Sequence, residues 1–228
     1  MNTESLSKVF ATHLGKTLHS TEEEIAVMAY GLFALLQTLL SIGIVIAIGA
    51  FLGIMFESFI LSLSIALLRK YSGGAHATSA ERCLFIGTFI SILGALLGHK
   101  LGLYLTVPLT VYIIFFIFIW NFYIVFKLAP VASPSKPLSS ISKQQKLKRG
   151  SLTMLLIYLL TVIFLSYITL VSHSPFPLIY AFCIMIGMSW QVFTLTTIGH
   201  KVASFLDHAL IHIFSIIKIS NYKGENNL

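Results

Sequence analysis

The stretch from Ile25 to Phe56 reads IAVMAYGLFALLQTLLSIGIVIAIGAFLGIMF and contains no charged residue. Runs of about 18 or more apolar residues are typical of membrane spans, and one helix crosses a bilayer with about 20 residues. This stretch is too long for one span, and the apolar pattern continues past it, interrupted only by Glu57. It therefore predicts two membrane helices, over residues 26–47 and 51–68, joined by a turn at Gly49 to Gly53.

The rest of the chain repeats this pattern. Hydrophobic residues make up 57% of the sequence and the mean hydropathy is +0.90, whereas soluble domains are about 45–50% apolar. Further apolar runs predict four more spans, over residues 84–97, 101–126, 152–172 and 177–198. The expected fold class is all-α, a polytopic membrane helix bundle of about six transmembrane helices, in one integral-membrane domain over residues 1–228.

Both ends of the chain show the pattern of a surface helix. In residues 1–24 the apolar residues recur at spacings of three and four, the period of one helix face, with Lys8 and Lys16 among the polar positions. This predicts an amphipathic helix that lies on the membrane with its lysines near anionic headgroups. A helix that caps the bundle is the alternative. Residues 199–228 predict a second amphipathic helix followed by a polar tail.

The basic residues predict the orientation of the bundle. The net charge is +7, but in a membrane protein basic residues first record topology, because they concentrate in cytoplasmic segments. With a cytoplasmic N-terminus, only Lys100 of the fifteen Lys and Arg residues falls on the outer side. The charge therefore indicates a multi-pass cell-membrane protein in contact with lipid, and no nucleic-acid partner. It places the segments 69–83 and 127–151 in the cytoplasm.

The segment 69–83, RKYSGGAHATSAERC, is a polar island between two apolar runs and holds His76 and Cys83. Thr78 and Glu81 have the spacing of a capping box, so a helix is expected to begin at Thr78. That start places Cys83 just beyond the first helical turn. Helix N-termini and nearby cations favour the thiolate form of a cysteine, which is the nucleophile. Cys83 is therefore a candidate nucleophile.

His76 is the natural partner for Cys83, but a single continuous helix would keep the two residues apart. At 1.5 Å per residue they would lie about 10 Å apart along the axis, whereas a working pair needs hydrogen-bond reach, about 3 Å. The backbone must therefore reverse before the helix begins. Gly73 and Gly74 supply that freedom, because glycine tolerates positive φ.

Two stretches resemble the AgrB family, the integral-membrane cysteine endopeptidases of Gram-positive quorum sensing. Gly74-Ala75-His76-Ala77 followed by Cys83 is similar to the catalytic segment of that family. The proline-containing basic segment from Ala129 to Arg149 is similar to its second recognisable stretch. In length and order of hydropathy the resemblance covers nearly the whole chain.

This resemblance implies a specific reaction. Cys83 would attack a peptide bond of an AgrD-like precursor with His76 as general base. The C-terminal tail of the precursor would leave, and a thioester with the enzyme would form. A cysteine or serine of the peptide would then close a thiolactone or lactone ring. The family also implies a homodimer, and the distribution of basic residues predicts that the catalytic residues lie on the cytoplasmic side.

The resemblance also implies where the substrate binds. Arg69 and Gly74 match family-typical positions, and Arg69 is expected to bind the substrate or the oxyanion, with anchoring of a helix end at the interface as the alternative. The basic segment suits the acidic tail of a precursor by charge complementarity, with topology and binding of anionic lipid as the alternative. The predicted substrate-binding residues are Arg69, Gly74, Lys136, Lys146, Lys148 and Arg149.

Other polar residues predict structural roles. Cys183 falls inside the last span and is expected to be a small buried apolar group, while Asn121 and Gln191 are expected to hydrogen-bond between helices. Glu57 is either a functional intramembrane carboxylate or a glutamate that reaches the interface. The histidines lack the spacing of a helical zinc site, so no metal and no cofactor is predicted.

One alternative comes from a different class of protein. Small membrane substrate-binding subunits of energy-coupling-factor-type importers have about this length and hydropathy. Such a subunit has no use for a glycine-containing cytoplasmic segment with His76 and Cys83, so the peptidase is the preferred interpretation.

Overall fold

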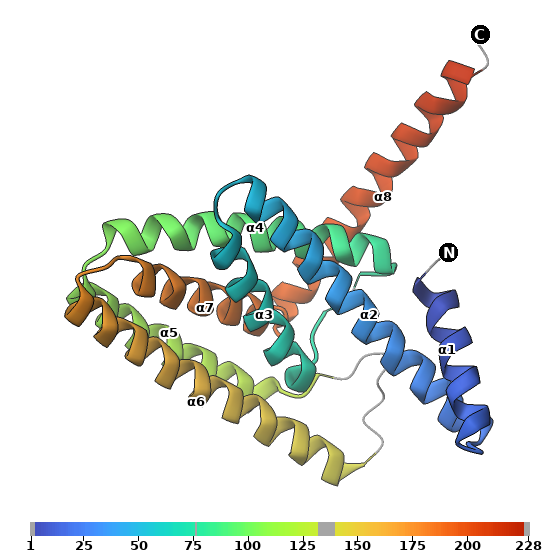
Figure 1. The fold of residues 1–228 in the computed structure, drawn as a ribbon, viewed down its shortest axis with the longest axis horizontal. Coiled ribbons are helices and arrows are strands. Elements are labelled where there is room, and N and C mark those ends of the chain that lie inside the picture. Colours follow the sequence, from blue (N-terminus) through green and yellow to red (C-terminus); the bar gives the residue numbers. More distant parts are fainter. Residues whose placement is uncertain (1–2, 76, 132–139, 226–228) are drawn as a thin grey trace.

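The computed structural model describes residues 3–75, 77–131 and 140–225, with side chains described as far as residue 212. These residues form helices joined by short loops, and no strand occurs among them. The helices are α1 (Thr3–Thr17), α2 (Glu22–Phe51), α3 (Met55–Ser72), α4 (Ala80–Tyr104), α5 (Val107–Leu128), α6 (Ile141–Ser172), α7 (Phe176–Phe193) and α8 (Thr197–Glu225). The expected all-α helix bundle is confirmed (Figure 1).

Within the described residues five helices, α2, α4, α5, α6 and α7, are long and apolar enough to cross a membrane. The chain is therefore a multi-pass membrane protein. The sixth expected span corresponds to α3, which lies inside the bundle but carries Glu57, Arg69 and Lys70 within its 18 residues. The turn between α2 and α3 falls where it was expected, with Gly53 at a φ of 73°.

Helix α7 is the centre of the bundle and packs against α3, α4, α5 and α6. Its side chains are buried over most of its length, and Ile179, Met185 and Met188 are fully enclosed. The predicted interhelical hydrogen bonds form on this helix. Asn121 of α5 donates to Ser189 Oγ at 3.1 Å, and Gln191 donates to Ser72 Oγ of α3 at 3.1 Å.

Several predicted helix boundaries are wrong. Helix α4 continues to Tyr104 because α5 does not begin until Val107, where Pro108 occupies one of the first two helical positions. Helix α6 begins at Ile141, inside the expected linker 127–151, because Ser140 caps it by accepting a hydrogen bond from Lys143 N at 3.2 Å. Helix α7 ends at Phe193, five residues earlier than expected, and α8 follows after a short turn.

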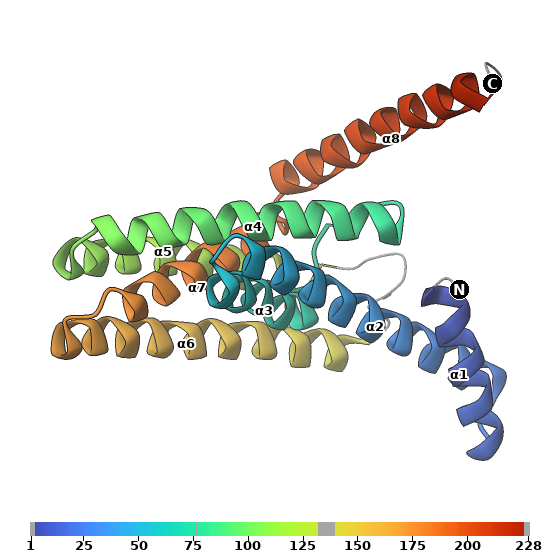
Figure 2. The ribbon, with the colours of Figure 1, turned by 45° about the horizontal axis from the view of Figure 1, so that its top comes forward.

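The two terminal helices differ in their contacts. Helix α1 packs against α2 through its small residues Ser7, Ala11 and Gly15, while its other face exposes Val9 and Phe10. This agrees with an amphipathic helix. Helix α8 begins beside α4 and extends away from the bundle, as both views show (Figures 1 and 2). It remains helical to Glu225, so the polar tail expected over this part is helical.

Candidate active site

The loop between α3 and α4 makes the backbone reversal that the glycines predict. Gly73 and Gly74 have φ values of 69° and 135°, which side chains rarely adopt. A Cβ on Gly74 would lie 2.7 Å from Thr194 Oγ1 and 3.1 Å from Gln191 Nε2. Only glycine fits here, because the backbone passes directly against the end of α7.

Three groups hold this loop in place. Ala75 N donates to the carbonyl oxygen of Thr194 at 3.2 Å. Gln191 Nε2 donates to the carbonyl oxygen of Gly73 at 2.7 Å, and Arg69 donates through Nη2 to the carbonyl oxygen of Ala75. The loop is therefore fixed by the end of α7 and by the last turn of α3.

A residue near the start of the second family-like stretch, Val131, lies beside the same loop. Val131 N donates to the carbonyl oxygen of Ser72 at 2.9 Å, and Val131 forms a parallel bridge with Gly73. A Cβ on Gly73 would lie 2.3 Å from Val131 O. Two segments that are far apart in the sequence thus form one backbone unit.

Helix α4 begins one residue later than the capping-box prediction, and its cap is different. Ser79 is the N-cap, and its Oγ accepts a hydrogen bond from Arg82 N at 3.3 Å. The predicted pairing of Thr78 with Glu81 is wrong because Thr78 bonds elsewhere in the fold. Cys83 is the fourth residue of the helix and is half-buried, so its thiol lies in the first turn.

A second anchor reaches the start of α4 from α2. Gln37 Nε2 donates to the carbonyl oxygen of Ala80 at 2.9 Å. Position 76 lies outside the described residues, so the predicted pairing of His76 with Cys83 stays a prediction.

Asp207 of α8 is the residue that the sequence interpretation missed. Its Oδ2 accepts hydrogen bonds from Thr78 Oγ1 at 2.6 Å and from Thr78 N at 3.1 Å. Its Oδ1 accepts from Arg82 Nε at 2.5 Å, and Arg82 Nη2 also donates to Thr78 Oγ1. One signal was present, because Asp207 is the single aspartate of the chain and interrupts an apolar helical period.

The charge of Asp207 is balanced by this contact. Asp207 is 2% exposed, and burial alone would raise the pKa of its carboxyl group. The hydrogen bonds from Thr78 and Arg82, together with the positive charge of Arg82, outweigh burial and lower that pKa below its usual value. Arg82, one of the cations near Cys83 in the sequence, is paired with Asp207 in this contact.

The predicted tail-binding cations lie on the first turns of α6. Lys146 and Arg149 are exposed, and Lys148 lies over the ring of Phe126 at 4.4 Å. A Cβ on Gly150 would lie 2.4 Å from the Tyr71 ring near the end of α3. This basic turn therefore lies near the α3–α4 loop. Lys136 lies outside the described residues.

A second polar pair lies at the other end of the bundle. Glu57 is 5% exposed, and its Oε1 lies 2.8 Å from His99 Nδ1. His99 is about 24 Å along α4 from Cys83 at 1.5 Å per residue, so this pair lies far from the candidate nucleophile. Cys183 is fully buried, as predicted, and its Sγ packs against Gly98.

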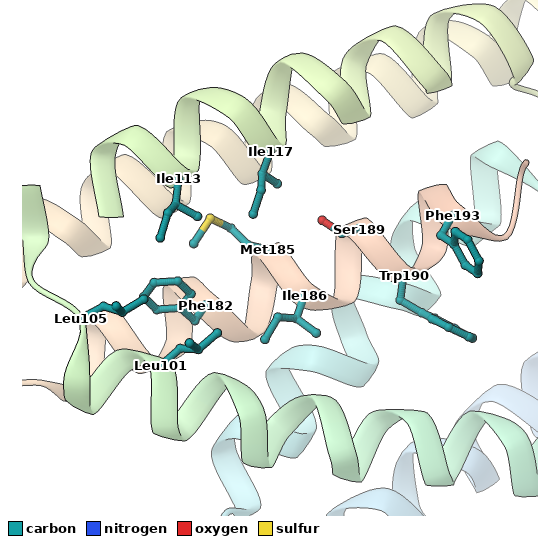
Figure 3. A pocket seen from close by; sticks show the side chains of 10 residues that line it. All are labelled: Leu101, Leu105, Ile113, Ile117, Phe182, Met185, Ile186, Ser189, Trp190 and Phe193. Carbon is teal, nitrogen blue, oxygen red and sulfur yellow. The ribbon is translucent and has the colours of Figure 1, made fainter. Parts of the chain in front are cut away.

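An apolar groove runs along the outer side of α7, between α4 and α5 (Figure 3). Its volume is about 420 Å³, and its side chains come from all three helices. The lining residues are Leu101, Leu105, Ile113, Ile117, Phe182, Met185, Ile186, Ser189, Trp190 and Phe193. None of these side chains is charged, so the groove suits apolar groups such as lipid chains. Among the described residues, no group of three potential metal ligands occurs.

Comparison with known proteins identifies a family. Residues 7–195 match the family Accessory gene regulator B. A Clostridium perfringens strain SM101 protein named as AgrB-like is 36% identical over 207 residues, which are 90% of this chain and 96% of that protein. A second AgrB-like protein, from C. perfringens strain 13, is 35% identical over the same shares. No solved structure matches.

Proposed function

The chain belongs to the Accessory gene regulator B family, and from this we propose that it is a membrane cysteine endopeptidase that processes an AgrD-like quorum-sensing precursor. The observation that carries the proposal is the position of Cys83. It lies half-buried in the first turn of α4, and side chains of α2, α3, α7 and α8 bond either the preceding loop or the start of that helix. Catalysis requires reacting groups that are held in one geometry, and this end of the bundle supplies such a framework.

The proposed reaction is acyl transfer through Cys83. His76 takes the thiol proton, and the Cys83 sulfur attacks the carbonyl carbon of the scissile peptide bond. The C–N bond breaks, the proton passes from His76 to the amine of the departing tail, and a thioester remains. A thiol or hydroxyl of the peptide then attacks that thioester and gives its proton to His76, and Cys83 leaves as its thiolate. The product is a thiolactone or lactone ring.

Hydrolysis by water competes with ring closure, because both reactions consume the thioester. A site that excludes water therefore favours the ring. Cys83 is followed by the apolar run of α4. A position at the boundary between the headgroups and the apolar core supports cyclisation over hydrolysis.

The acidic tail of the precursor is proposed to bind the first turns of α6. Lys146, Lys148 and Arg149 are placed near the α3–α4 loop through the contact of Gly150 with Tyr71, and Lys136 belongs to the same basic segment. Arg69 and Gly74 were expected to bind the substrate directly. Their contacts favour a supporting role, because Arg69 holds the carbonyl of Ala75 and Gly74 packs on α7.

The orientation and assembly of the protein form part of the proposal. The concentration of basic residues around the α3–α4 loop and the start of α6 favours a cytoplasmic site. A homodimer is proposed from family membership alone.

The experiment is expression of the chain with an AgrD-like precursor peptide, followed by mass analysis of the products. Wild-type protein is expected to release the tail and to form a cyclic peptide. Cys83→Ala and His76→Ala are each expected to lower cleavage by more than about 1,000-fold, since the nucleophile and its base act together.

Cys183→Ala is the matched control, because the second cysteine is enclosed in the core. This variant is expected to cleave at the wild-type rate. Full cleavage by Cys83→Ala protein, at wild-type amounts in the membrane, would refute the proposed function.

A further inference from the structure

We propose that Asp207 is a positioning residue of this active site, through which α8 holds the first turn of α4, and with it Cys83, in the geometry for attack. The inference rests on the proposed peptidase function and adds a residue that lies beyond the family match, which ends at residue 195.

The contact is built on both sides of the start of α4. Thr78 immediately precedes the N-cap Ser79, and Arg82 immediately precedes Cys83. Asp207 accepts three hydrogen bonds from these two residues. Because Thr78 lies before the first turn and Arg82 lies within it, one carboxylate fixes both the entry of the chain into α4 and the rotation of the helix that carries the thiol.

The burial of these groups shows that the contact is part of the folded structure. The side chain of Asp207 is 3% exposed and that of Arg82 is 20% exposed, so both groups are largely removed from water. A buried carboxylate that lost these partners would remain unpaired in a site of low polarity, which is costly. An ion pair between exposed long side chains would do little to fix the position of the backbone. The largely buried pair of Arg82 and Asp207 does restrict the position of the residues around it.

The contact also complements the other anchors of the site. Gln37 of α2 holds the carbonyl of Ala80, and the end of α7 holds Gly73 and Ala75. The segment between Ala75 and Ala80 receives its side-chain support from α8. Asp207 therefore supports Thr78, which lies between these other anchors.

The test compares Asp207→Asn with His208→Asn in the full-length protein in membranes. Asparagine keeps the size of aspartate but removes the charge and places an NH₂ group where one oxygen accepted. His208 is the next residue of α8, is exposed and bonds only within its own helix. Asp207→Asn is expected to lower kcat for the AgrD-like precursor by about tenfold and to leave KM within twofold of the wild-type value. His208→Asn is expected to match wild type in both.

A second readout does not depend on the peptidase activity. In a Cys183→Ala background, alkylation of Cys83 by N-ethylmaleimide is expected to be at least threefold faster with Asp207→Asn, because the first turn of α4 loosens. In a Cys83→Ala background, the buried Cys183 is expected to stay unreactive with and without Asp207→Asn. Exposure of both cysteines would indicate general unfolding and would overturn the positioning role.

Two further variants keep the proposal testable if the Asp207→Asn protein fails to fold. Thr78→Val removes a single hydroxyl from an exposed residue and is expected to lower kcat about threefold. Arg82→Gln combined with Asp207→Asn is expected to lose no more activity than the worse single variant. Losses that multiply would show that the two residues act separately.

The outcomes separate this inference from the proposed function. If Cys83→Ala protein still cleaves the precursor, the peptidase assignment fails whatever Asp207 does. If cleavage depends on Cys83, but Asp207→Asn and Thr78→Val match wild type in kcat and in alkylation rate, only the positioning role fails.

Discussion

Each end of the bundle contains one buried carboxylate, and the two carboxylates have different partners. Asp207 accepts three hydrogen bonds from the segment that leads into Cys83. Glu57 contacts His99 and thereby ties the start of α3 to the later part of α4. Both are at most 5% exposed. The partners therefore decide the role of each carboxylate, and burial alone does not identify a functional group.

The two ends also differ in how glycine is used. At the far end, Gly98 lets Cys183 pack against the α4 backbone, inside regular helix. At the loop end, Gly73 and Gly74 adopt positive φ and bring the backbone against Val131 and Thr194. Regular packing therefore stabilises the far end, whereas the loop end depends on an irregular backbone held by hydrogen bonds.

The largest expected effect of this difference is at Gly74. Gly74→Ala would place a Cβ 2.7 Å from Thr194 Oγ1 at a φ of 135°, so the loop must move away from α7. Precursor cleavage is expected to fall more than about tenfold, since small displacements of reacting groups cost large factors. Gly43→Ala is the control, because a Cβ there meets nothing within 4 Å. Wild-type cleavage by Gly74→Ala would show that the loop geometry is not needed.

A smaller effect is expected from the basic turn of α6. Replacing Lys146, Lys148 and Arg149 together with glutamine removes the charges proposed to bind an acidic tail. KM for the precursor is expected to rise about tenfold with little change in kcat, and added salt is expected to raise KM less than in wild type, because fewer charges remain to be screened. Lys8→Gln with Lys16→Gln is the control at α1. An unchanged KM would leave these cations with a role in topology alone.

The smallest effect on activity is expected at the far end. Glu57→Gln removes the charge that faces His99 but keeps the size of the side chain, so the folded bundle should lose about 1–3 kcal/mol. The expected result is a melting temperature lower by a few degrees and an unchanged kcat for the precursor. If Glu57→Gln protein had normal thermal stability but cleaved the precursor much more slowly, the far end of the bundle would have a role in activity, against this expectation.

The sequence predicts the part of the fold that hydropathy governs. The apolar runs predict the membrane helices, the positive φ of Gly73 and Gly74 agrees with the expected reversal, and Asn121 and Gln191 form the predicted interhelical bonds. These features are local or follow from burying polar groups among apolar helices. Local rules were therefore sufficient for them.

Tertiary contacts determine the features that the sequence did not predict. Helix α4 continues through His99, where Glu57, 42 residues away in the sequence, pairs with it. Thr78 does not cap α4 because Asp207, 129 residues away, accepts its hydroxyl and its backbone amide. A capping box is a pattern of four residues and contains no information about a distant carboxylate.

The bridge between Gly73 and Val131 has a consequence for protein engineering. The two connecting segments are joined by the backbone hydrogen bond from Val131 N to Ser72 O and by the close approach of Gly73 to Val131, so neither can be exchanged on its own for the matching piece of a relative. A chimaera made to change peptide preference should transfer residues 72–75 and 129–131 together, because a graft of either segment alone would combine two backbones that do not fit each other.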